Sequence, residues 1–212
     1  KWIKSDIQHK INLSIFFIIS FFLSILIIKN LKVNFLVNTI LVTSALYLFL
    51  VTSREFLIKG INNLAQNLAH FGFSLLILSI LFNNFFSTEV ITNLKIGETF
   101  KSEKINITFE SIEKKEIKNY SSIIGKININ DPKGLNQTLE PELRIYNQPN
   151  IVTSEADIKT NLFSDKFITM NLVQNQDYFN IRYQIKPFMI WIWLSVLLIC
   201  SGGLISLFRK KI

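Results

Sequence analysis

The chain has 212 residues, of which 49% are hydrophobic, and its formal net charge is +8. Its mean hydropathy of +0.33 is high for a soluble domain. The charge does not form a nucleic-acid groove, because the segment 89–186 contains 13 basic and 13 acidic residues and the whole basic excess therefore flanks apolar runs. That placement is typical of a membrane protein and argues against a nucleic-acid partner. Cys200 is the only cysteine, which excludes an internal disulfide and a site for covalent c-type haem within the chain.

Four apolar runs predict four transmembrane helices. Each has about 20 residues, enough to cross a hydrocarbon core of roughly 30 Å. In chain order the predicted spans are 11–28, 35–51, 68–87 and 188–208.

The basic residues predict the orientation of these spans. The flank 1–10, the segment 52–67 and the tail 209–212 carry Lys or Arg and are expected in the cytoplasm. In 52–67 the apolar residues recur at near-helical spacing, which predicts a cytoplasmic interfacial helix. The segment 88–186 is then expected on the outer, periplasmic side.

That outer segment has a β pattern. Ile105, Ile107 and Phe109 alternate with polar residues, and two further stretches, 166–173 and 178–185, have the composition of short strands. The predicted fold is therefore a membrane protein of four transmembrane helices, with a small all-β periplasmic domain inserted between the last two. The domain is expected to be an antiparallel sandwich or barrel.

Of the two histidines, His9 is expected to be a solvated flank residue, whereas His70 lies near the start of the third span. An ionisable side chain at membrane depth is costly and usually faces a partner or a cavity. Neutral imidazole is a good axial ligand for iron. Ala69 and Gly72 are small enough to admit another helix or a flat macrocycle. The residues leave two alternatives: an iron ligand, or a histidine hydrogen-bonded between helices.

Several landmarks together resemble one family. They are Asn-Leu-Ala-His-Phe-Gly at 67–72, Leu-Glu-Pro-Glu-Leu-Arg-Ile-Tyr at 139–146, Thr-Ser-Glu-Ala-Asp-Ile at 153–158, and Lys-Pro leading into Trp-Ile-Trp at 186–193. In this order they resemble the C-terminal portion of the CcmF/NrfE family, the haem lyase subunit of cytochrome c maturation. The family's Arg-Asp-Leu-Tyr is replaced here by Ser-Asp-Lys-Phe at 164–167.

The resemblance implies a cofactor, partners and a location. His70 would be an axial ligand of a membrane haem b, with the second ligand outside this chain, and substrate haem would pass through transiently. The implied partners are apocytochrome c, a periplasmic haem chaperone, the other cytochrome c maturation subunits and the lipid bilayer. The implied location is the bacterial inner membrane, or the mitochondrial inner membrane if the protein is organelle-encoded.

Four polar residues of the outer segment are candidates for contact with a partner or a haem propionate: Glu142, Arg144, Glu155 and Asp157. The alternative is architectural, with Glu142 pairing with Arg144 on one strand face and the other two holding a loop. No acid/base dyad, Ser-His-Asp set or glycine-rich phosphate loop is present, so no catalytic residue is expected and this portion would not be catalytic alone. A different class of function also remains open, a membrane-tethered β domain that acts as a receptor or assembly scaffold without haem.

Overall fold

The computed structural model describes residues 2–31, 33–59, 63–103, 105–130, 136–173 and 177–208, with side chains from Lys10 onwards except that of Lys59. The predicted tail 209–212 and the side chain of His9 lie outside this part. The chain divides into a helical unit, Lys1–Phe86 with Pro187–Ile212, and a β unit, Ser87–Lys186.

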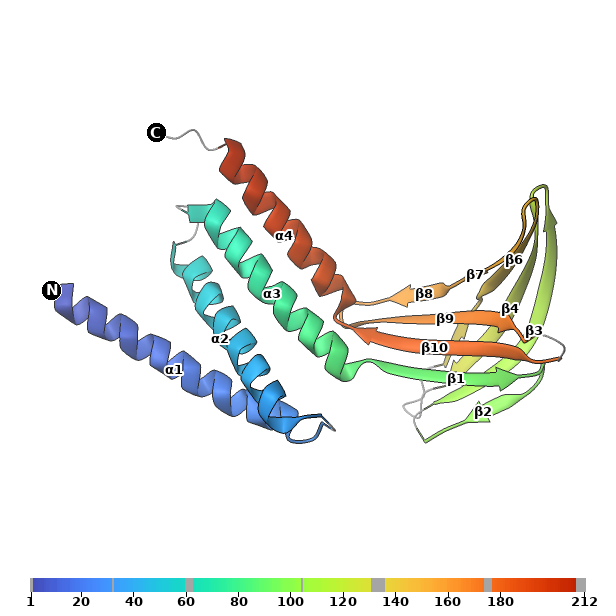
Figure 1. Cartoon of the computed structure of the whole chain (residues 1–212), viewed down its shortest axis with the longest axis horizontal. Coiled ribbons are helices and arrows are strands. Elements are labelled where there is room, and N and C mark those ends of the chain that lie inside the picture. Colours follow the sequence, from blue (N-terminus) through green and yellow to red (C-terminus); the bar gives the residue numbers. More distant parts are fainter. Residues whose placement is uncertain are drawn as a thin grey trace. The chain divides into compact units, whose positions relative to one another are not determined.

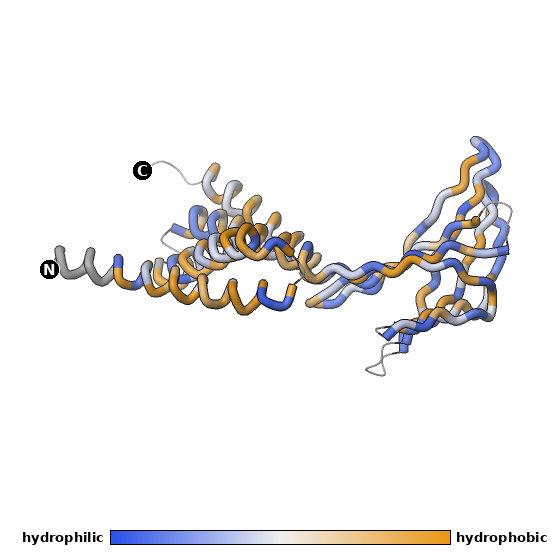
Figure 2. Tube along the Cα trace, turned by 60° about the horizontal axis from the view of Figure 1, so that its bottom comes forward, coloured by the Kyte–Doolittle hydropathy of each residue, from blue (hydrophilic) through white to orange (hydrophobic). Residues whose placement is uncertain are grey.

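Four apolar helices form the helical unit, as predicted (Figure 1). Three precede the β unit and one follows it; they are α1 Trp2–Ile28, α2 Phe35–Lys59, α3 Leu64–Phe86 and α4 Met189–Phe208. Each contains a stretch long and apolar enough to cross a membrane. Figure 2 shows hydrophobic residues along all four helices, whereas hydrophilic and hydrophobic residues mix along the strands. Many helix side chains face outward, such as Leu26 and Leu197, which are about two-thirds exposed (66% and 65%).

The segment 52–67 differs from its prediction. In the described residues of this segment α2 continues to Lys59 and α3 begins at Leu64, and these residues form no separate helix. The sequence has neither proline nor glycine between 51 and 59, so nothing interrupts the backbone hydrogen bonds of α2 at the end of its apolar run. Gly60 is the first residue that favours a break.

Buried hydroxyl pairs join the first three helices. Ser24 Oγ of α1 lies 2.7 Å from Thr43 Oγ1 of α2, and Thr52 Oγ1 of α2 lies 2.7 Å from Ser74 Oγ of α3. Each of these hydroxyls also lies within hydrogen-bond distance of a carbonyl oxygen of its own helix, so each pair adds a polar contact between neighbouring helices.

The α3–α4 contact depends on small residues. A Cβ atom added at Gly202 of α4 would lie 2.7 Å from the carbonyl oxygen of Ala65 and 2.9 Å from the backbone nitrogen of Ala69. A Cβ at Gly72 of α3 would lie 3.0 Å from the carbonyl oxygen of Ser195. The two backbones therefore approach more closely than larger side chains would permit.

The β unit consists of two sheets (Figure 1). The first has the order β1-β10-β9-β8, with bounds Thr88–Leu94, Phe179–Pro187, Ser164–Leu172 and Asp157–Thr160. The second has the order β2-β3-β4-β6-β7, with bounds Thr99–Lys101, Asn106–Ile117, Tyr120–Asn130, Glu142–Asn147 and Asn150–Glu155, and β5, Asn136–Leu139, also pairs with β4. The domain is thus a sandwich, one of the two architectures that the sequence allows.

The alternating residues face the core of this sandwich, as predicted. Ile107, Phe109 and Ile127 of the second sheet and Ile168 and Ile181 of the first are fully buried, and so is Met170. The ring of Phe109 meets that of Phe179 edge to face, with centroids 5.2 Å apart. This core gives the β unit a hydrophobic centre of its own.

Candidate functional site

His70 lies in the second turn of α3 and its side chain is exposed. It shares one helix face with Gln66, Phe73 and Ile80, which are exposed as well. Positions 66, 70, 73 and 80 are separated in turn by four, three and seven residues, the spacing that places side chains on one face of a helix. Within the described part of the chain, no residue forms a hydrogen bond with the imidazole. The two alternatives for His70, an iron ligand and a histidine hydrogen-bonded between helices, both remain predictions.

Its small neighbours face another helix. A Cβ atom added at Gly202 would lie 3.2 Å from the Ala69 Cβ, and one added at Gly72 would lie 3.0 Å from Ile199 and from Ser195, so α4 covers the side of α3 that Ala69 and Gly72 form. His70 is one residue from Ala69, about 100° further round the helix. The close contact thus fixes the helix that carries His70 without covering the imidazole.

A hollow of about 350 Å³ opens between the same two helices, lined by Asn63, Ala65, Gln66, Ala69, Gly202, Gly203 and Ser206. Gln66 belongs both to this lining and to the face of His70. The described residues hold no group of three or more His, Cys, Asp or Glu side chains that could bind a metal ion.

Three of the four polar candidates form one cluster on the second sheet. Arg144 Nη2 donates to Glu142 Oε2 at 2.9 Å, and Arg144 Nη1 lies 3.8 Å from Glu155 Oε1. The guanidinium also lies over the ring of Tyr120, 5.2 Å from its centroid. The hydrogen bond from Arg144 lowers the pKa of the Glu142 carboxyl, and the same bond raises the pKa of Arg144.

Asp157 lies apart from this cluster, on β8 of the other sheet. Its Oδ2 accepts a hydrogen bond of 2.7 Å from the backbone nitrogen of Glu140, which precedes Pro141. The chain changes sheets between Glu155 and Asp157. All four candidates therefore make contacts within their own domain.

The Arg144→Met variant should test the ion pair through pH. The pKa of Glu142 is lower in the folded than in the unfolded state. The ion pair therefore stabilises the fold fully at pH values above the unfolded pKa, about 4.3. This contribution is lost as the pH falls through the lowered pKa of the folded state. Chemical unfolding followed by circular dichroism should show the variant less stable than wild type at pH 7, with a gap that closes in acid.

Lys126→Met is the matched control, because Lys126 makes a more exposed ion pair with Glu110 at 3.6 Å, of a kind that contributes little to stability. A gap for Arg144→Met that stayed constant down to the lowest pH would contradict a contribution from the charged pair.

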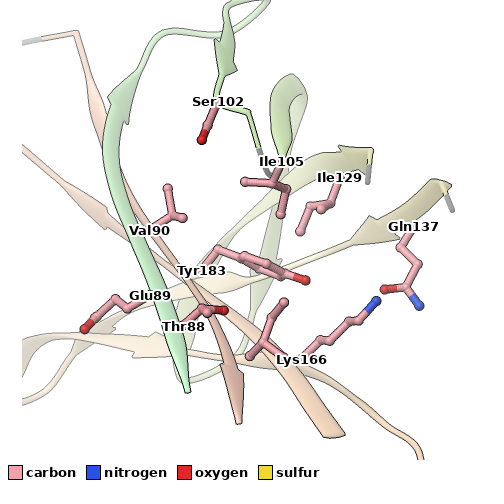
Figure 3. Close-up of a pocket in the computed structure, with 10 residues that line it drawn as sticks. Thr88, Glu89, Val90, Ser102, Ile105, Ile129, Gln137, Lys166 and Tyr183 are labelled. Atoms are coloured by element: carbon pink, nitrogen blue, oxygen red, sulfur yellow. The ribbon is translucent and has the colours of Figure 1, made fainter. Parts of the chain in front are cut away.

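The sequence did not indicate a pocket of about 410 Å³ that opens between the two sheets of the β unit. Its lining is apolar at Val90, Ile105, Ile129 and Ile185, and polar at Thr88, Glu89, Ser102, Gln137, Lys166 and Tyr183. Figure 3 shows the Lys166 amine, the Gln137 amide and the Tyr183 hydroxyl on one side of it. These three residues come from separate strands, so no local sequence motif predicts that they lie close together.

Glu89 at the same pocket is held by its neighbours on β10. Its carboxylate accepts hydrogen bonds from Arg182 and from Gln184 Nε2, and the bond with Arg182 is the main cause that lowers the pKa of Glu89. Lysine, amide and phenol groups above an apolar floor can bind a ligand that is part apolar and part polar.

Comparisons with known proteins agree with this architecture. A family profile described as CcmF C-terminal beta-sandwich matches residues 85–187. The cytochrome c-type biogenesis protein CcmF of Haemophilus influenzae is 26% identical over 165 residues, which cover 76% of this chain and 26% of that protein. The protein ccl1 of Rhodobacter capsulatus, also named for cytochrome c-type biogenesis, is 31% identical over 58% of this chain and 19% of its own length.

One solved structure, named cytochrome c heme lyase CcmF, superposes with a TM-score of 0.66 at 15% identity, over 94% of this chain and 34% of that one. The chain spans about a quarter of the length of the relative from Haemophilus influenzae. The profile, the relatives and the fold agree: residues 85–187 match the CcmF C-terminal β-sandwich, and the chain corresponds to a C-terminal portion of CcmF.

Proposed function

We propose that this chain is part of a protein that acts in cytochrome c biogenesis, and that His70 is one axial ligand of a haem b whose second ligand lies outside the chain. The observation that carries the proposal is the exposed imidazole, which has no hydrogen-bond partner among the described residues and lies on a helix apolar enough to cross a membrane. The relatives named for cytochrome c biogenesis and the fold named heme lyase support it.

The surroundings of His70 fit such a ligand. A metal-bound histidine needs one ring nitrogen unprotonated and accessible, and an isolated charged imidazole is unfavourable at membrane depth. The side chain is exposed while its helix is held by α2 and α4 through Ser74 and Gly202. Haem iron would supply electron-transfer chemistry there.

The β unit would serve haem attachment on the periplasmic side of the membrane. We place the helices in an inner membrane and the β unit in the periplasm, where the longer protein would receive haem from a chaperone and help attach it to apocytochrome c with other maturation subunits. The charge pattern supports this orientation. Glu142, Arg144, Glu155 and Asp157 are partly exposed and remain candidates for contact with a partner or a haem propionate.

A scaffold or receptor without haem is the second candidate, and the pocket between the sheets favours it. The two are separated by a reduced-minus-oxidised spectrum and a pyridine haemochrome spectrum of the purified full-length protein. We expect a b-type signal. A correctly folded protein without haem would refute the haem proposal and favour the scaffold.

A further inference from the structure

The turn between β8 and β9 exposes two large apolar side chains side by side. Leu162 is 62% exposed and Phe163 is 70% exposed, and both lie outside the hydrophobic core of the β unit. Adjacent exposed side chains of this size are costly in water, which makes the turn a candidate contact surface.

Hydrogen bonds fix the conformation of this turn. Asn161 Oδ1 accepts from the backbone nitrogens of Phe163, at 2.9 Å, and Ser164, at 2.8 Å, while the nitrogen of Asn161 donates to the carbonyl of Ser164 at 3.1 Å. This is an Asx turn between paired strands, with Thr160 opposite Asp165. The side chains of Leu162 and Phe163 are therefore presented by a rigid support.

The turn lies at a defined end of the first sheet. β9 and β10 are neighbours of nine residues each, and Val173 donates to the carbonyl of Tyr178 where the chain passes from one to the other. The start of β9 therefore lies beside the end of β10, and β1 begins at the same end because Thr88 pairs with Ile185. Lys166, Thr88 and Ile185 line one pocket, which agrees with this placement.

At this end the chain enters and leaves the β unit. Only Ser87 separates α3 from β1, and only Phe188 separates β10 from α4. Consecutive Cα atoms are about 3.8 Å apart, so a membrane spanned by α3 and α4 would have its surface within a few residues of Thr88 and Pro187. Ile96, also exposed at 48%, follows the opposite end of β1 and serves as a comparison.

We propose that the turn at 161–164 is a membrane anchor, with Leu162 and Phe163 inserted at the boundary between lipid headgroups and acyl chains; this inference rests on the proposed membrane location of α3 and α4. An exposed apolar tip close to the membrane surface suits such a boundary.

A lipid surface fits the turn better than a protein partner does. Two side chains at a convex tip cover far less than the roughly 1,200–2,000 Å² of a stable protein interface. A domain already tethered at both ends needs only a small additional contact to hold one orientation, because the tether keeps the local concentration of the surface high.

Spin labels measure the depth of this turn. The full-length protein, freed of other cysteines and with Cys200→Ser, would be reconstituted in nanodiscs of phosphatidylcholine and phosphatidylglycerol. Nitroxides at Leu162→Cys, Ile96→Cys and Leu197→Cys would then be compared by power saturation with oxygen and with a water-soluble nickel chelate. We expect oxygen to dominate at 162 and 197 and the nickel chelate to dominate at 96.

The outcomes separate the two proposals. A nickel-accessible label at 162 beside an oxygen-accessible label at 197 would overturn the anchor alone, whereas nickel access at 197 would overturn the membrane location of α4. Protection of 162 from both reagents would indicate a protein cover and would also overturn the anchor. Phe163→Ser should make the label at 162 shallower; an unchanged depth would show that the tether alone sets its position.

Discussion

The His70→Ala variant of the full-length protein is expected to lose the b-type haem spectrum of the wild type. Alanine supplies no ligand atom, and a haem held by two axial ligands loses one of its iron bonds. Because the His70 side chain is exposed and makes no hydrogen bond to any described residue, its removal should leave the packing of α3 intact. Haem absorbance and thermal unfolding, measured on the same purified sample, would check both statements.

Two controls distinguish ligation from folding. Gln66→Ala changes an exposed residue one turn earlier on the same face and should keep the haem. Imidazole added to a His70→Gly variant should restore part of the spectrum, because the free ligand can occupy the space of the missing side chain. A b-type spectrum that survives in His70→Ala would place the ligand elsewhere in the protein.

The helices and the β core could be predicted because each depends on a local pattern. A span of about 20 apolar residues is recognisable wherever its neighbours lie. The alternation at Ile105, Ile107 and Phe109 places these side chains on one face before any partner strand is known, and the structure buries all three. His70 stands out for a similar reason, since an ionisable residue is conspicuous in an apolar run.

Features that depend on distant residues could not be predicted. The pocket between the sheets needs Lys166, Gln137 and Tyr183 to meet from three strands. The extension of α2 past residue 51 was missed for another reason: the apolar run ends there, but the helix continues while its backbone hydrogen bonds can form. A loss of hydropathy marks the end of a span, and a glycine or proline marks the end of a helix more reliably.

The neighbouring glycines of α4 also could not be told apart from the sequence, and substitutions at them give the second prediction with a large expected effect. Gly202 and Gly203 are equivalent in the sequence, yet Gly202 is buried against α3 and Gly203 has no atom within 4 Å of an added Cβ. We expect Gly202→Leu to destabilise the helical unit strongly, toward the upper end of the roughly 1–3 kcal/mol that overpacking costs. The contacts are backbone atoms of Ala65 and Ala69, which cannot rotate away, so α3 and α4 must separate.

Gly203→Leu is the matched control, with the same change one residue away. It should be neutral or stabilising, since leucine favours a helix over glycine by up to about 1 kcal/mol and meets no neighbour here. Thermal unfolding in detergent, followed by circular dichroism, would compare the two variants. Equal losses would show that the helix pair does not depend on close approach at Gly202.

The same pair of variants connects packing to the proposed haem site. Ala69 contacts Gly202 and immediately precedes His70, so a shift of α3 away from α4 also moves the imidazole. Gly202→Leu should therefore lower haem content together with stability, whereas Gly203→Leu should preserve both. Full haem occupancy in a destabilised Gly202→Leu protein would mean that the position of His70 is set by contacts other than those of α4.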